Sequence, residues 1–366
     1  MGRALLIGLL GGLLVAAGVA LGPLPLLVPG LALVVLAVGA VGWVLLAARG
    51  RVERRLGRAR VVEDEPLPVV VEAATAMPVP GSELVEPLAP GPGEPVGTRR
   101  RQRLETEVRF PRRGGHRLEP ARLVVRDPLR IAGHVLRSPE DQEVLVLPRI
   151  EPVRVAARGG ARAGTLARAS AQPAEEGPRI ELDTLREAPE GAPAARIHWP
   201  AVARTGKLIE RTLLPETDRR PLVVVDAAEP SSTEALDMAV RAAASLCVVL
   251  ARAGGCDLLL PGERRPSHVD AVLSAWPTLH ARLALVAAGP SPILPARFAR
   301  TGAVFWVTGR VAGSGGGRVP PTLARAAGSA RFLVEPGPSM AGASAAFTVA
   351  GCSGRRLDRP SRRVAA

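Results

Sequence analysis

The stretch that decides the architecture is ALLIGLLGGLLVAAGVALGPLPLLVPGLALVVLAVGAVGWVLLAA, residues 4–48, which carries no charged side chain. A membrane-spanning helix needs about 20 apolar residues, so this run is long enough for two. Helix-breaking residues stand near its middle, where a reversing chain needs them: Pro23, Pro25, Pro29 and Gly30. The pattern predicts a transmembrane helical hairpin over residues 1–50, with helices at about Ala4–Leu21 and Leu31–Ala48.

Arginines on both sides of this run set the expected orientation. Arg3 precedes the first helix and a series beginning with Arg49 and Arg51 follows the second, whereas the reversal between them is uncharged. Basic flanks stay on the cytoplasmic side, so both termini and the soluble domains are expected in the cytoplasm, below the inner or plasma membrane. A cleaved signal peptide is the alternative, but its apolar core is only about 7–15 residues long, and here a second apolar segment follows at once.

The composition is strongly basic, with a formal net charge of +14, but aromatic residues make up only 2% and Lys207 is the one lysine. A nucleic-acid-binding protein usually carries aromatic side chains that stack on bases. An arginine-rich surface beside an anionic membrane explains the same charge. The cysteines Cys247, Cys256 and Cys352 form no C-x-x-C pair, so we expect small buried residues rather than a disulfide framework or a zinc site.

Residues 51–155 read as a β-rich domain, because short β-branched runs alternate with proline, glycine and charged turns. A small β-sandwich fits this pattern. The predicted strands are Leu67–Glu72, Leu104–Phe110, Arg122–Val125 and Glu143–Leu147. His116 and His134 stand alone and are expected at surface or turn positions. Residues 156–215 would hold a linker, rich in Ala, Arg and Gly up to residue 177, followed by a motif block.

Residues 216–352 alternate strand and helix patterns, starting from PLVVVD (221–226), which is typical of a buried central strand. The other predicted strands are Asp257–Leu260, Leu283–Ala287 and Ala303–Thr308. A helix over Thr233–Ala253 would be capped by Ser232 and ended by Gly254 and Gly255, and a second helix would cover Ser267–Trp276. We expect an open, mainly parallel α/β sheet with helices on both faces, and a basic tail over residues 353–366.

The most specific stretch is LREAPEGAPAARIHWPAVARTGKLIE, residues 185–210, preceded by RDP at 126–128 and LPR at 147–149. This ordered set resembles domain-of-unknown-function family 58. The resemblance implies two N-terminal spans, a β-rich segment and a C-terminal domain similar to von Willebrand factor A. The chain departs from the family pattern at Ala188, Glu190, Ala192 and Ala195, where the family shows Tyr, Pro, Asp and Arg.

The block supplies the candidate interaction residues: Arg186, Glu187, Gly191, Arg196, His198, Trp199, Arg204, Gly206 and Lys207. Its arginines are suited to pairing with carboxylates of this chain or of a partner. A Trp serves as a large anchor in a core or at an interface. The other interpretation is a structural crossover that docks the β-rich region onto the final domain, since no nucleophile–base pair accompanies the block.

Asp226 follows the first strand of the final domain, at the end where open α/β sheets bind ligands. In von Willebrand factor A domains this position opens an Asp-x-Ser-x-Ser loop that holds Mg²⁺ through oxygen ligands. Here Ala228 and Pro230 occupy the two serine positions. We therefore expect no cofactor, with a degenerate Mg²⁺ site at Asp226 as the less favoured interpretation and a loop-capping role as the favoured one.

These observations predict a membrane-anchored, non-enzymatic interaction protein. The resemblance implies a MoxR-type AAA+ ATPase as partner, together with transglutaminase-like membrane proteins, in assembly, remodelling or envelope maintenance. Two alternatives remain: a hydrolase using Asp226, Glu229 and His198, and an electrostatic binder of anionic lipid or nucleic acid. Walker A, GxGxxG, HExxH and GxSxG motifs are absent from the sequence.

Overall fold

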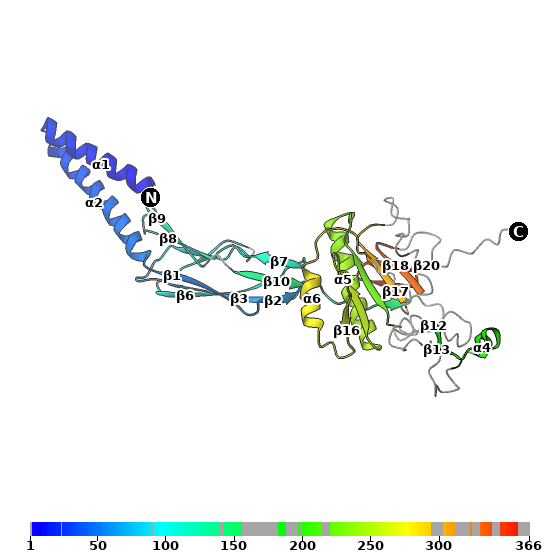
Figure 1. Cartoon of the computed structure of the whole chain (residues 1–366). Helices are drawn as coiled ribbons and strands as arrows, with labels where there is room; N and C mark the ends of the chain where they lie inside the picture. Colours follow the sequence, from blue (N-terminus) through cyan, green and yellow to red (C-terminus); the bar gives the residue numbers. More distant parts are fainter. Residues whose placement is uncertain are drawn as a thin grey trace. The chain divides into compact units, whose positions relative to one another are not determined.

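The computed structural model divides the chain into two compact units, Met1–Leu147 and Pro148–Ala366 (Figure 1). It describes residues 2–22, 24–89, 91–139, 142–155, 182–187, 197, 199–213, 220–293, 303–311, 323, 330–338 and 345–357. Each unit is described by itself below. The predicted linker at 156–177 lies outside the described residues.

Two apolar helices open the N-terminal unit: α1 covers Gly2–Leu21 and α2 covers Leu24–Ala47. Both are long and apolar enough to cross a bilayer. In the most apolar 18-residue segment of each helix, only 17% of α1 and 28% of α2 is buried. A core helix of a soluble protein would bury most of such a surface. The pair therefore has the length and composition of a two-span membrane protein.

The second helix begins seven residues earlier than the sequence predicted, so the expected start at Leu31 is wrong. The chain reverses at Gly22, which has a φ of +84°. Pro25 falls in the first turn of α2, where a missing N–H costs nothing. Pro29 lies inside the helix and removes one backbone hydrogen bond, but the helix continues past it.

Gly30, expected at the turn, serves close helix packing instead. A β-carbon on Gly30 would lie 2.9 Å from the backbone nitrogen of Val15 and 3.0 Å from the carbonyl oxygen of Gly11. A β-carbon on Gly11 would lie 2.8 Å from the carbonyl oxygen of Gly30. The two backbones are thus in direct contact, which is how small residues hold apolar helices together where no hydrophobic effect drives their association.

The rest of the N-terminal unit is built from three small sheets. One has the order β1-β3-β6, the second β2-β10-β7 and the third β5-β4-β8-β9. Their bounds are β1 Arg51–Leu56, β2 Arg60–Val62, β3 Leu67–Ala74, β4 Glu83–Val85, β5 Glu94–Pro95, β6 Arg101–Val108, β7 Gly114–Arg117, β8 Arg122–Arg126, β9 Gly133–Arg137 and β10 Glu143–Leu147. The four predicted strands correspond to β3, β6, β8 and β10.

Alternate residues of these strands meet in one core. In β3 the side chains of Leu67, Val69 and Val71 are fully buried while the residues between them are more exposed, which is the period-two pattern of a half-buried strand. The same cluster includes Ala47 at the end of α2 and inward-facing residues of β1, β2, β4, β6, β8 and β10. Burial on one face only fixes the register of each strand.

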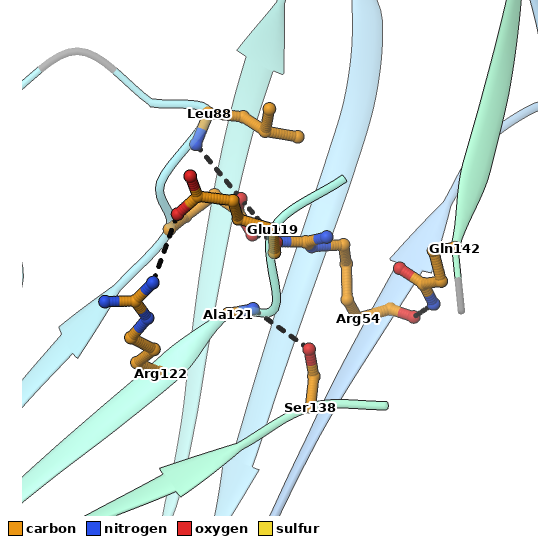
Figure 2. Close-up of polar contacts among 8 residues, drawn as sticks. Arg54, Leu88, Glu119, Ala121, Arg122, Ser138 and Gln142 are labelled. Carbon is orange, nitrogen blue, oxygen red and sulfur yellow. Dashed lines mark hydrogen bonds and ion pairs between the residues drawn. The ribbon is translucent and has the colours of Figure 1, made fainter. Parts of the chain in front are cut away.

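An ion pair lies inside this unit. Arg54 on β1 donates from Nε and Nη2 to the two carboxylate oxygens of Glu86, at 2.8 and 2.7 Å, and neither side chain is exposed. Arg54 also donates to the carbonyl oxygen of Glu119, and Glu86 accepts from the Leu88 N–H (3.2 Å). Figure 2 shows the segments that converge here, with Gln142 donating to the backbone carbonyl of Arg54. The pair joins parts of the chain that are far apart in sequence.

The C-terminal unit is organised around an eight-stranded sheet with the order β11-β19-β20-β18-β17-β14-β15-β16. The bounds are β11 Arg154–Val155, β14 Leu222–Asp226, β15 Cys256–Leu259, β16 Ser267–Val269, β17 Ala303–Thr308, β18 Ala330–Pro336, β19 Phe347–Val349 and β20 Cys352–Leu357. The four central strands are parallel, and every pairing outside them is antiparallel. The sheet is therefore mixed rather than mainly parallel.

Two predicted boundaries change as a result. Residues 154–155 pair with β19 in this sheet, so they do not end the β-rich domain. Residues 353–357 belong to β20 and are not part of a tail. Both segments were hard to recognise because β11 is only two residues long and β20 has polar residues, including Arg355 and Arg356, between its two apolar ends.

The described helices of this sheet, α5 (Thr233–Arg252) and α6 (Trp276–Ala284), share one core with its inward side chains (Figure 1). Ser232 caps α5 as predicted, because its hydroxyl accepts from the Ala235 N–H at 3.0 Å. The opposite face has its own cluster around Leu222, Trp306 and Leu323. Helices α5 and α6 cover one face, and Leu323 in the cluster on the other face is a helical residue whose neighbours lie outside the described ranges.

Two local predictions are wrong. Ser267–Trp276 is not a helix: Ser267–Val269 forms β16, and Asp270 then accepts hydrogen bonds from the backbone N–H and the hydroxyl of Ser274, which closes a turn. Leu283–Ala287 is not a strand, because Leu283 lies on the buried face of α6. That helix begins at Trp276 with a proline in its first turn, a position that tolerates the missing N–H.

Candidate functional site

Asp226, the candidate ligand at the carboxyl end of β14, is buried and holds three hydrogen bonds from neutral donors. Its Oδ1 accepts from the Ala228 N–H (3.1 Å) and from the Ser291 hydroxyl (3.2 Å). Its Oδ2 accepts from the indole Nε1–H of Trp306 on β17, at 3.2 Å. The bond to Ala228 is the loop-capping contact expected from the sequence.

These residues do not fit a Mg²⁺ site. Asp226 offers a carboxylate, but the loop positions that would add oxygens hold Ala228 and Pro230. A hard cation needs about six oxygen ligands, most of them from carboxylates, carbonyls or water. Among the described residues, no group of three or more His, Cys, Asp or Glu side chains is placed to share a metal ion.

The loops around Asp226 are joined by a second set of contacts. Ser231 donates its N–H to the Gly309 carbonyl (3.0 Å), and its hydroxyl accepts from the Val311 N–H (2.9 Å). Arg310 donates from Nε to the Ala228 carbonyl (3.1 Å) and pairs with the largely exposed Glu229 at 3.3 Å. The strand-end surface is therefore held in one shape by backbone contacts between the loops after β14 and β17.

Glu335, near the end of β18, is a further buried acid on this unit. Burial raises the pKa of its carboxyl above the usual value, and Arg355, 3.4 Å away, opposes that shift. No sequence pattern indicated this residue, because neither β18 nor β20 was predicted. The ion pair between Glu335 and Arg355 depends on the strand register, which sets Glu335 opposite Ser353 on β20.

The motif block is described in part. Its ends pair as a two-stranded sheet of β12 (Leu182–Glu187) and β13 (Ile209–Leu213), in which Arg186 is opposite Glu210 and Glu187 is opposite Ile209. Between them, α4 covers Trp199–Thr205. Gly191, Arg196 and His198 lie outside the described residues, and the same holds for the side chains of Arg186 and Glu187.

The described part of the block presents an apolar and basic surface. The Trp199 residue is 59% exposed and Leu208 is 53% exposed. Arg204 and Lys207 are exposed between them in the sequence. Gly206 ends the helix with a φ of +69°, and its N–H donates to the Val202 carbonyl at 2.8 Å. A Trp left this open to solvent is unusual in a folded domain, where the ring is normally well buried.

The LPR part of the family pattern has a packing role that the sequence did not reveal. His280 on α6 contacts the Pro148 carbonyl oxygen through Nε2 at 2.7 Å and stacks on Trp276. The Glu151 N–H donates to the Ser245 hydroxyl on α5, at 2.9 Å. Residues 148–151 are thereby attached to α5 and α6, and nothing in the spacing of His280 or Ser245 could have indicated it.

Trp306 and Ser291 are the other contacts that sequence reasoning missed. The donor on β17 could have been suspected, because a Trp in a fully buried strand has an indole N–H that needs an acceptor. Ser291 lies in an irregular segment with no periodic pattern.

A scan against protein-family models and a search of curated proteins gave no match to this chain.

Proposed function

We propose that this protein is a membrane-anchored, non-enzymatic interaction protein. In this proposal α1 and α2 span the membrane, the small sheets form a β-sandwich, and the C-terminal unit is a von Willebrand factor A-like domain without its metal. The soluble units would lie on the cytoplasmic side. The resemblance of residues 185–210 to domain-of-unknown-function family 58 makes a MoxR-type AAA+ ATPase the proposed partner.

The observation that carries the proposal is the exposure of Trp199. Trp, Tyr and Arg are enriched among the interface residues at which truncation costs about 2 kcal/mol or more. Arg204 and Lys207 give this surface a positive charge, which suits an acidic face on the partner. Arg204 is exposed in the described structure.

The proposal is tested by purifying the full chain from detergent-solubilised membranes and identifying what copurifies. Wild-type protein is expected to recover an AAA+ ATPase, and W199A or R204S is expected to recover much less. The matched control is V272A, which changes an apolar residue that is 87% exposed in the same unit but outside the block. Equal recovery by all variants would remove the block as the docking surface, and failure of the wild type would remove the partner.

The orientation has a separate test. Protease added outside whole cells should leave the C-terminal unit intact, and the protein should remain in the membrane fraction. Digestion of residues beyond Leu147, or release of the protein into the medium, contradicts the proposed topology.

The hydrolase alternative has less support. It requires Asp226, Glu229 and His198 to share a pocket, but Asp226 is engaged by three donors and Glu229 by Arg310. A general base must reach the proton that it removes, and a carboxylate with both oxygens occupied is poorly placed to do so. An electrostatic binder of nucleic acid stays an alternative, and its affinity would fall steeply with salt.

A further inference from the structure

The turn between β8 and β9, residues 127–132, lies beside the apolar helices rather than in the body of the β-rich region. Ala132 shares a buried cluster with Ala4 of α1 and with Ala40 and Val44 of α2. Trp43 and Ile131 pack against the same cluster. Both β8 and β9 contact α2, and Figure 1 shows them next to its carboxyl end.

The depth of this contact can be estimated from helix geometry. At 1.5 Å per residue, Val44 and Ala40 lie about 7 and 13 Å from Arg49 along α2. If Arg49 marks the edge of the headgroup layer, that layer of about 5–7 Å ends close to Val44. The turn therefore extends to the boundary between headgroups and acyl chains, the depth at which amphipathic Trp side chains such as Trp43 prefer to lie.

The outer surface of the turn is apolar at its tip and basic around it. Leu129 is 61% exposed, and the neighbouring Pro128 and Arg130 are exposed as well. His134 and Arg137 are exposed on β9. An exposed leucine next to arginines suits a layer that is apolar below and anionic above.

Several backbone groups of the turn are paired within it. The buried Asp127 accepts from the Leu129 N–H (2.9 Å) and the Ala132 N–H (2.5 Å), and its carbonyl accepts from the Arg130 N–H at 2.9 Å. The Asp127 N–H donates to the Ala132 carbonyl at 3.2 Å. Unpaired backbone groups are what keeps irregular segments out of lipid, so this pairing lowers the cost of insertion.

We propose that residues 128–131 form a third membrane contact, in which Leu129 inserts into the bilayer interface and Arg130 binds the phosphate of an anionic lipid. This rests on the proposed anchoring by α1 and α2. The occupant is the bilayer because the turn is continuous with the surface of two apolar helices. The Asp-Pro pair of the RDP motif then has a physical role, since Asp127 folds the turn and Pro128 begins its exposed part.

The test uses full-length protein in nanodiscs made from phosphatidylcholine and phosphatidylglycerol, with and without lipids carrying a doxyl quencher near the headgroup. The three native cysteines are buried, so a single thiol introduced by L129C can be labelled with a polarity-sensitive fluorophore under native conditions. We expect blue-shifted emission and strong quenching by the doxyl lipid. The control A59C carries the label at an exposed position. Ala59 lies beyond the far end of β1, a six-residue strand about 20 Å long that starts next to α2, so this label should not be quenched.

A third probe separates this inference from the anchoring on which it rests. Leu9 is exposed in the middle of α1, so a label at L9C should be quenched by doxyl groups deep in the acyl chains. Quenching at L9C without quenching at L129C would overturn the third contact and leave the anchor standing. Absence of quenching at L9C would overturn the anchor itself. Adding R130S to L129C should weaken quenching in anionic nanodiscs, and unchanged quenching would remove the role given to Arg130.

Discussion

Glu86 in the N-terminal unit and Asp226 in the C-terminal unit are both buried carboxylates, but their partners differ in charge. Glu86 is held by the guanidinium of Arg54, with the Leu88 N–H as a further donor. Asp226 is held by three neutral donors. In a low-dielectric interior an unpaired charge costs far more than an unpaired dipole, so the two regions should respond differently when one partner is removed.

Removing Arg54 is expected to have the largest effect. R54M leaves Glu86 charged and buried without its cation, which should destabilise the N-terminal unit by about 3–5 kcal/mol. The double variant R54M/E86L replaces the pair with apolar side chains and should be more stable than R54M. Pulsed trypsin digestion in urea, with fragments from residues 51–147 followed by mass spectrometry, measures the change. A double variant no better than the single one would mean that the charge of Glu86 is not the cause.

A smaller effect is expected at Asp226. W306F removes the indole donor and leaves one buried carboxylate oxygen unsatisfied, which should cost about 1–3 kcal/mol. The readout is the labelling rate of the three cysteines, because all of them are buried in the C-terminal unit. R54M should leave this rate unchanged. If R54M accelerates labelling as much as W306F does, the two units do not unfold independently.

The helix cap gives a third, still smaller effect in the same unit. S232A removes the acceptor for the Ala235 N–H and should cost about 1 kcal/mol, whereas S232T keeps the acceptor and should stay close to wild type. Urea unfolding followed by cysteine labelling compares the two. Equal losses in both variants would show that the hydroxyl is not what stabilises this end of α5.

The smallest effect is a change in pH dependence at Glu335. Burial raises the pKa of this carboxyl above 4.5, so the folded C-terminal unit binds its proton more tightly than the unfolded chain does. That contribution to stability is present at low pH and is lost as pH rises through the raised pKa. As the pH is raised from about 4 to about 7, the free energy of unfolding of E335Q should therefore fall less than that of the wild type. Parallel urea midpoints for the two proteins across this range would contradict the shift.

The features predicted from the sequence were those that depend on local pattern. The charge-free N-terminal run, the alternation in β3, the buried strand β14 and the Ser232 cap are all written in consecutive residues. The errors arose where longer-range contacts decide. Gly30 looked like a turn residue because its contact with Gly11 is invisible in the sequence. The apolar end of α6 looked like a strand because five consecutive residues fit both patterns.

The candidate site was predicted less well than the fold. Asp226 was recognised from its place at the end of a buried strand, and the residues Ala228 and Pro230 that follow it were also visible. Its partners were not, because Trp306 and Ser291 reach it from segments that are 80 and 65 residues away. The buried pair of Arg54 and Glu86 was missed for the same reason, since neither residue stands out among many other charged residues in that region.

The position of β20 in the sheet has a consequence for how the chain is made. The last described strand lies between β18 and β19, so β18 has no neighbour on that side until residues 352–357 have been synthesised. A nascent chain that has reached only β18 therefore carries an open, largely apolar strand edge, the kind that pairs with other chains. Ribosomes that stall within residues 339–351 would release products prone to aggregation, whereas the first 147 residues form a compact unit that does not include that strand.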